Sequence, residues 1–559
     1  MVNIGFRCVA WRETLDWWVW LPAMQATIDT TKRRTWERLA SPAEAVAAAL
    51  EKKWLLLALV FGEVYLAITI LHSLRRFWYD ELFTYYMTRL PGFGVLWTAL
   101  KEGADLNPPL FYLVTEGFQK LFGDGEPGTR LPAVVGFLLM LLCIFLFVSR
   151  YGSRLAALAA MSFPVITGAY YYASEARPYG IELGFAGVAA VCWQSAARNE
   201  RRNLYLPGMA LALGCALMSH CYAVLVLIPF AVAEAVRLVL RRKFDWPMLA
   251  ALAAPCPLVL SYLPLMGVAR HDTWNNAFFR PDWTSFADCY WKLFGGALLP
   301  LLLAGVFLVL DRWAHSPSIP PPVGAGSIPV QDMAIAVGFG VVPVFAVLLA
   351  MTVTGLYEFR YGILGTIGVS ILLGALLARR SRSSKAAAAA VFLVFAGTFL
   401  ASSGLWVARF FAPPAASHEA SEPPLRLADL SEGVPIVMAD PILFLEFDHY
   451  ESPKLLSRMY YLTDRAAALH YTGATAFGSF DRPKKWFPLR AHLEDYRAFV
   501  ASHPRFFVVT SDRNPLCWVM QKVADDKLPF VSRGEFNSQH GHAVVAEILV
   551  PPEKQQAGH

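Results

Sequence analysis

Two acidic stretches, WYDEL at residues 78–82 and DLNPPLFY at residues 105–112, interrupt an otherwise apolar sequence. They follow the first long apolar run, and most of the sequence beyond them is hydrophobic. Carboxylates at the edge of a membrane are costly to desolvate, so they usually mark a functional site. We therefore predict a folded loop that holds a polar pocket at the bilayer surface. A solvated loop with ordinary surface acids is the alternative.

The composition is typical of a polytopic membrane protein. Of the 559 residues, 56% are hydrophobic and only 16% are charged, and the 17 Trp and 21 Tyr fit interfacial aromatic belts. The net charge of +6 is small, and the basic residues of the sequence lie in short clusters; both features argue against a nucleic-acid partner. The eight cysteines include no CxxC pair and favour neither a disulfide framework nor a metal site.

Apolar runs of spanning length recur from residue 54 onward, and we expect eleven transmembrane helices. The shorter apolar segment 108–122 carries Glu116 and Lys120, so we predict a helix on the membrane surface there. The predicted spans lie near residues 54–72, 130–149, 155–173, 180–197, 204–219, 222–240, 247–268, 297–313, 333–355, 361–378 and 386–407.

The basic residues predict the orientation of these spans. With the N-terminus inside, every second junction is basic, as the positive-inside rule requires. We therefore expect a multi-pass protein of the inner (plasma) membrane with a cytoplasmic N-terminus. The basic junctions are Arg150 with Arg154, residues 198–202, residues 241–243, Arg312, and residues 379–385.

Three regions follow from this topology. Residues 1–53 form a cytoplasmic or interfacial segment, residues 54–407 a multi-spanning domain with the external loop 73–129, and residues 408–559 an extracytoplasmic domain. In the last region, strand-like runs at 434–438, 505–510 and 543–550 alternate with helical stretches such as 489–502. This alternation predicts a small α/β domain.

Four motifs carry a resemblance to a known family. FWYDEL at 77–82, DLNPPLFY at 105–112, and Glu126 with Arg130 resemble the first external loop of the C-type membrane glycosyltransferases. YASEARPYG at 172–180 resembles their second external loop. The sequence is most similar to the protein O-mannosyltransferase and aminoarabinose transferase superfamily, in its bacterial family 39-like branch. Some relatives have an Asp in the second loop where this chain has Glu175, which leaves the role of Glu175 open between catalysis and binding.

The resemblance implies the C-type glycosyltransferase fold and a polyprenyl-phosphate-linked sugar donor. A glycan, lipid or protein hydroxyl would be the acceptor, and transfer would proceed with inversion at the external face. Phosphate is a good leaving group, so the departing oxygens need only cationic and hydrogen-bonding stabilisation. The acceptor hydroxyl needs a base, which a carboxylate supplies.

These requirements suggest roles for individual residues. We assign Asp80 as the base, with Glu81 and Asp105 orienting the acceptor or Asp80 itself, and Glu175 as a further catalytic candidate. Candidate ligands of the donor phosphate are Arg177, Tyr179, Arg360 and Tyr361, and candidate acceptor or loop residues are Asn107 and His271.

Each assignment has a structural alternative. Glu175 and Arg177 would pair with each other at a helix end, and Arg360 would extend to the membrane interface. His271 would belong to a solvated loop. No dense group of metal ligands is visible in the sequence, so a divalent metal is not indicated, although some C-type relatives use one.

Two other functional classes compete with the transferase. A transporter or flippase of lipid-linked sugars would show internal repeats and charges near mid-membrane. We find no internal repeat, and Glu63, Glu182 and Glu234 are the main charges within predicted spans. A sensor anchored by its helices would not need eleven of them. The identity of the sugar is not encoded in any recognisable motif.

Overall fold

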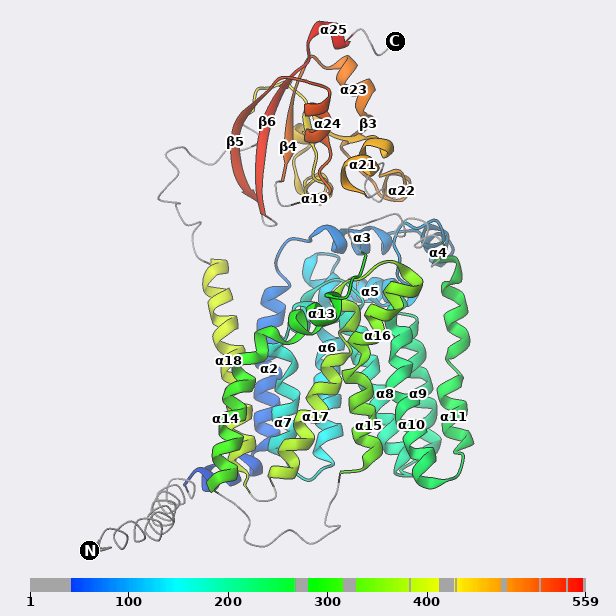
Figure 1. The fold of residues 1–559 in the computed structure, drawn as a ribbon, viewed down its shortest axis with the longest axis vertical. Helices are drawn as coiled ribbons and strands as arrows, with labels where there is room; N and C mark the ends of the chain where they lie inside the picture. Colours follow the sequence, from blue (N-terminus) through cyan, green and yellow to red (C-terminus); the bar gives the residue numbers. More distant parts are fainter. Residues whose placement is uncertain are drawn as a thin grey trace, which may run out of the picture.

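The computed structural model describes residues 42–265, 267, 280–314, 328–381, 384–411, 427, 430–473, 480–511, 514–538 and 541–555. These residues form a bundle of long helices with a mixed β-sheet at one end (Figure 1). The bundle contains α2 (Trp54–His72), α6 (Glu126–Ser149), α7 (Arg154–Ser162), α8 (Tyr179–Ala197), α9 (Arg202–Leu217), α10 (Leu227–Arg241), α11 (Trp246–Ala253), α14 (Leu298–Ala314), α15 (Val330–Gly340), α16 (Val342–Leu349), α17 (Gly365–Arg380) and α18 (Ala386–Phe411).

The predicted count of eleven membrane spans is confirmed only in part. Among the described residues, six helices are long and apolar enough to cross a membrane, and two bent pairs raise this number to eight. Each of the eleven predicted runs overlaps a helix, but α8, α9 and α17 do not meet the same criteria. The helices α9 and α17 have 16 residues each, below the roughly 20 that a span usually needs. The chain is a multi-pass membrane protein, and the count of eleven is not confirmed.

The helices α6 and α8 approach each other closely because glycines line their contact. A Cβ atom on Gly136 would lie 2.5 Å from the carbonyl oxygen of Gly180, and one on Gly184 would lie 2.6 Å from that of Gly136. Small residues allow such backbone contact between membrane helices. This contact holds the start of α8 beside the N-terminal half of α6, where two of the sequence motifs lie.

The loop 73–129 caps one end of the bundle with three short helices (Figure 1). They are α3 (Tyr79–Met87), α4 (Phe93–Lys101) and α5 (Pro109–Phe122). The helix α5 covers nearly the same residues as the predicted surface helix 108–122. Its N-terminus is favoured by Pro109, because proline at the first helical position lacks only an N–H that has no intrahelical partner.

The C-terminal region contains a six-stranded mixed sheet in the order β3-β2-β1-β4-β6-β5. The first four strands in this order pair in parallel, and β6 pairs antiparallel with both β4 and β5. The helical prediction for 489–502 is wrong in its first part: His492–Asp495 form a strand beside β2, and only Tyr496–Ser502 are helical. The strands are β1 (Ile436–Met438), β2 (Met459–Thr463), β3 (His492–Asp495), β4 (Arg505–Thr510), β5 (Phe530–Ser538) and β6 (Gly541–Leu549).

The C-terminal region that contains this sheet, called the sheet region, shares one hydrophobic core with the loop 73–129. Phe77 and Leu82 belong to the same buried cluster as Phe444 and Tyr461 of the sheet region. Phe444 lies on α19 (Pro441–Tyr450), which Figure 1 shows directly above α3. Burial of several aromatic and aliphatic side chains in one cluster joins these two regions into a single packed unit.

The predicted basic junctions gather at the other end of the bundle. Arg150 donates to Gln194, Arg198 lies 3.4 Å from Asp332, and Arg380 pairs with Asp311. These contacts link the ends of helices that are distant in sequence, so residues of three predicted basic junctions pair with neighbouring helices. This arrangement agrees with the predicted alternation of the two ends.

Candidate active site

The two acidic residues of the first motif point in different directions. Trp78 is extended and α3 begins at Tyr79, so Asp80 and Glu81 lie in the first helical turn. Consecutive side chains on an α-helix are separated by about 100°. Glu81 therefore faces the protein interior while Asp80 faces the site, although the two are adjacent in sequence.

Glu81 is completely buried in a network that satisfies both its oxygens. Its Oε1 accepts hydrogen bonds from Arg130 Nε at 2.6 Å and from the Ala176 N–H at 2.7 Å. Its Oε2 accepts from the Trp78 N–H at 3.2 Å and from a second nitrogen of Arg130. Burial alone would raise the pKa of Glu81, but the Arg130 guanidinium outweighs it and holds this pKa below its usual value.

Asp80 is the most accessible of the four candidate carboxylates. Its side chain is 20% exposed, compared with 8% for Asp105 and 0% for both Glu81 and Glu175. Arg360 Nη2 lies 3.1 Å from Asp80 Oδ2. Asp80 is thus both held by a cation and open to a substrate.

Asp105 forms a second ion pair next to the first. Arg177 Nη1 donates to Asp105 Oδ2 at 2.9 Å and to the main-chain carbonyl of Asp80 at 3.1 Å. The other oxygen of Asp105 accepts from the Leu106 N–H at 2.7 Å and faces the Asn107 amide at 3.5 Å. Through Arg177, Asp105 fixes the backbone that carries Asp80.

Glu175 has an unusual electrostatic environment. The Trp78 indole Nε1 donates to its Oε1 at 2.7 Å, and its buried Oε2 has no hydrogen-bond partner among the residues that the structure describes. Burial raises the pKa of Glu175 to about 7; Arg360 opposes this shift, and the nearby Glu81 and Asp80 charges add to it. This carboxyl group therefore changes its charge near neutral pH.

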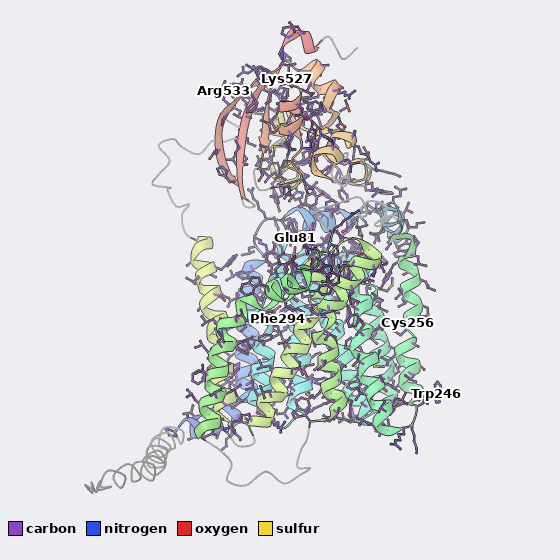
Figure 2. The ribbon with its side chains drawn as sticks, viewed as in Figure 1. Glu81, Trp246, Cys256, Phe294, Lys527 and Arg533 are labelled. Atoms are coloured by element: carbon purple, nitrogen blue, oxygen red, sulfur yellow. The ribbon has the colours of Figure 1, made fainter. Side chains whose placement is uncertain are left out.

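Hydrogen bonds join the two external motifs residue by residue. Arg75 donates to the hydroxyl and carbonyl of Ser174 at 3.1 Å each. Further along, Trp78 contacts Glu175 and Glu81 contacts Ala176, as described above. Figure 2 shows Glu81 at the boundary between the bundle and the sheet region. The segments 75–81 and 174–177, almost 100 residues apart, thus form one site.

Aromatic rings line the side of the site that holds the arginines. The guanidinium of Arg360 lies 5.8 Å from the ring centre of Tyr179, in the range of a cation–π contact. Tyr361 stacks on Tyr222, with ring centres 4.1 Å apart. Behind them, His220 lies 3.1 Å from Glu182, one of the charges identified within a predicted span.

Arg177 and Arg360 each retain an unused donor. The buried Nε atoms of both side chains have no hydrogen-bond partner among the described residues. A buried N–H without an acceptor is destabilising, so such donors favour an incoming anion. Two guanidinium groups close to Asp80 could bind the oxygens of a phosphate group.

Both arginines form ion pairs with carboxylates of the first external motifs. Arg177 pairs with Asp105, and Arg360 pairs with Asp80. His271 lies outside the described residues. Nine of the ten predicted site residues therefore lie in or beside one site, and the tenth is not placed.

The site residues predicted from the sequence did not include Arg130, Trp78 and Arg75. Arg130 begins an apolar run, and a fully buried cation at that position could have been suspected from its cost in a membrane. Trp78 and Arg75 contact residues of the second external motif. Because that motif is distant in sequence, no local sequence pattern predicts these contacts. Among the described residues, no group of three or more His, Cys, Asp or Glu is arranged to hold a metal ion.

Comparisons with known proteins give one family and a set of solved structures. Residues 106–265 match the model of the family described as dolichyl-phosphate-mannose-protein mannosyltransferase, which confirms the resemblance noted in the sequence. No curated protein matches the chain significantly.

The solved structures are distant. ArnT from Cupriavidus metallidurans bound to undecaprenyl phosphate is 14% identical, with a TM-score of 0.49 over 88% of this chain and 98% of that one. The apo form of the same ArnT is 14% identical with a TM-score of 0.43, covering 90% of this chain and 99% of that one. The Archaeoglobus fulgidus oligosaccharyltransferase is 12% identical, with a TM-score of 0.33 over 81% of this chain and 69% of that one.

Proposed function

We propose that this chain, a membrane glycosyltransferase of the dolichyl-phosphate-mannose-protein mannosyltransferase family, transfers a sugar from a polyprenyl-phosphate donor to an acceptor hydroxyl. Transfer takes place at the extracytoplasmic face and inverts the anomeric centre. The acceptor is a glycan, a lipid or a protein. The observation that carries this proposal is the position of Asp80, accessible in the site and paired with Arg360.

The donor phosphate is the leaving group, and the arginines receive it. Arg360 and Arg177 stabilise the negative charge that develops on the departing oxygens, in part through their unused Nε donors. Tyr179 and Tyr361 form the aromatic wall behind these cations. Because the phosphate and Asp80 compete for Arg360, donor binding releases the Asp80 carboxylate to take the proton of the acceptor hydroxyl.

The other predicted site residues position this base. Glu81 fixes the first turn of α3 through its buried pair with Arg130, and Asp105 with Asn107 orients Arg177. Because Glu81 is buried and both its oxygens are hydrogen-bonded within the protein, it acts through structure rather than through contact with substrate. Removing one partner of such a buried ion pair typically costs about 3–5 kcal/mol. Glu175 supports the Trp78 side of the loop, and its raised pKa leaves it as the second candidate for a proton acceptor.

The membrane arrangement is part of the proposal. We place the loop 73–129 and the domain 408–559 outside an inner (plasma) membrane, residues 1–53 inside, and residues 54–407 in the bilayer. Together with α8, α9 and α17, the eight candidate spans make eleven transmembrane helices. We propose that these helices form the C-type glycosyltransferase fold. The gathering of basic junctions at the end opposite the site supports this orientation.

A comparison of lipid-linked sugars tests the proposal. Purified protein is reconstituted with a panel of polyprenyl-phosphate sugars, and release of polyprenyl phosphate is followed by mass spectrometry. Cell-envelope glycans and glycolipids from cells with and without the protein identify the acceptor. We expect consumption of one donor and loss of one sugar modification. Transport of an intact lipid-linked sugar without cleavage of its glycosidic bond would refute a transferase.

A further inference from the structure

A cavity lies between α10 and α11, remote from the candidate active site. Its volume is about 430 Å³. In Figure 2, Trp246 marks the end of the bundle opposite the sheet region, and Cys256, which lines the cavity, lies further up the same outer edge. The cavity thus extends along the membrane-facing side of the bundle toward its basic end.

The two ends of the cavity differ in chemistry. Leu227, Ala231 and Leu252 line the end nearer the site, and Arg237, Arg241 and Lys243 line the basic end. An apolar slot that leads to a cationic end matches the shape of a phospholipid, with its acyl chain in the slot and its headgroup among the cations. Basic pockets between transmembrane helices on the cytoplasmic side are typical binding sites for anionic headgroups.

Arg237 gives the strongest indication of an anionic ligand. The residue is 3% exposed, and its Nη1 lies 2.9 Å from Asp245 and 3.1 Å from Glu234. Its Nη2 is buried and has no hydrogen-bond partner within the described part of the chain. A phosphate oxygen in the cavity would satisfy this donor, and an uncharged acyl chain would not.

The local charges favour an anion even though two carboxylates are present. Asp245 and Glu234 form ion pairs with Arg202, Arg237 and Arg241, and Lys243 also lines the cavity. Four basic side chains against two carboxylates give the cluster a surplus of positive charge. The exposed rings of Phe244 and Trp246 stack with centres 5.3 Å apart, as expected at the membrane–water interface.

We propose that this cavity binds an anionic phospholipid of the leaflet opposite the candidate active site, which is the cytoplasmic leaflet in the proposed orientation. The phosphate lies against Arg237 and the rim cations Arg241 and Lys243, and one acyl chain fills the slot between α10 and α11. The site is separate from the donor site and does not depend on the proposed reaction.

Native mass spectrometry tests this site on the full chain in detergent with added phosphatidylglycerol or phosphatidylcholine. We expect phosphatidylglycerol to bind at least about tenfold more tightly, because each basic residue near an anionic lipid contributes roughly a factor of five or more. The double variant Arg241→Gln/Lys243→Gln changes only rim side chains and should lose this preference. Ala231→Trp fills the slot and should weaken the binding of both lipids.

Arg379→Gln is the matched control, because Arg379 is an exposed cation at the same end of the bundle outside the cavity. It should bind phosphatidylglycerol as the unmodified protein does. Equal affinity for the two lipids, or unchanged phosphatidylglycerol binding in the double variant, would overturn the proposal. Displacement of phosphatidylglycerol by equimolar polyprenyl phosphate would show that the carrier lipid is the occupant and would overturn it as well.

Discussion

Arg360 reaches Asp80 at 3.1 Å while its buried Nε atom has no partner among the described residues. At the scale of single residues, this geometry supports the proposal that donor binding releases the base. Neither residue needs to move far, because Tyr179 supports the guanidinium from one side. The donor phosphate would replace the Asp80 carboxylate as the anion that Arg360 binds.

Replacing Arg360 tests this exchange. Arg360→Gln removes a charged donor to the phosphate, and such hydrogen bonds contribute about 1.5–3 kcal/mol, so donor affinity should fall roughly ten- to hundredfold. Arg360→Lys keeps the positive charge but lacks the forked geometry of the guanidinium, so it should retain only part of the donor affinity of the unmodified protein. Equilibrium binding of the donor to purified variants measures the effect. Unchanged affinity in Arg360→Gln would remove Arg360 from the phosphate site.

Glu175 predicts a pH dependence of stability. Its folded pKa of about 7 lies above the usual 4.5, so its contribution is fully present below pH 4.5 and is lost as the pH rises through 7. Glu175→Gln should remove this loss and make the protein more stable at pH 8, by up to about 3 kcal/mol. Thermal unfolding between pH 4.5 and 8 measures the difference.

The exposed Glu553→Gln serves as the control and should leave the pH profile unchanged. A Glu175→Gln protein with the pH profile of the unmodified chain would show that Glu175 is ionised throughout this range. In that case its buried Oε2 would need a cationic partner.

At the scale of elements, α19 holds the start of α3 in place. The Tyr450 hydroxyl accepts the Phe77 N–H at 2.6 Å and donates to Glu126 Oε1 at 2.9 Å. On the neighbouring side, the Trp486 indole donates to Glu102 at 3.0 Å. Together with the shared core, these bonds make the sheet region a support for the loop that carries Asp80.

Removing the Tyr450 hydroxyl should loosen this support. In Tyr450→Phe, two hydrogen bonds are lost, one of them to a carboxylate, which predicts a destabilisation of about 1–3 kcal/mol. Hydrogen exchange of residues 77–87 should accelerate. Tyr471→Phe removes a hydroxyl that donates to Asp525 on an exposed part of the sheet region and should leave this exchange unchanged. Equal hydrogen-exchange rates in the two variants would show that the Tyr450 hydroxyl does not stabilise the loop.

For the whole molecule, the proposed topology predicts which positions are accessible. A reporter fused after residue 420 should be active only outside, and Lys101→Cys should react with an impermeant thiol reagent in intact cells. Lys101 is suitable for this test because its side chain is exposed. Arg379→Cys should react only after permeabilisation. A cytoplasmic tail reporter would invert the proposed orientation.

The sequence predicts the helices of the bundle well because a bilayer demands long apolar runs. It also predicts that residues 78–81 and 174–177 belong to one site, through their motifs. It does not predict that Glu81 pairs with Arg130, because adjacent residues on a helix face different neighbours and the partner is 49 residues away. The core shared by Phe77 and Phe444 is equally hidden, since packing between distant segments leaves no local pattern.

The central claim is that Asp80 is the base of a sugar transfer, and separate measurement of donor affinity and turnover for Asp80→Asn tests it most directly. The substitution keeps the shape of the side chain and removes its proton acceptor. Thermal unfolding first establishes that the purified variant is folded. We predict that turnover falls by about 10²–10⁴-fold while donor affinity is not lowered, because the neutral amide of the variant no longer competes with the phosphate for Arg360. Near-normal turnover in a folded Asp80→Asn protein would contradict the account and shift the role of base to Glu175 or Asp105.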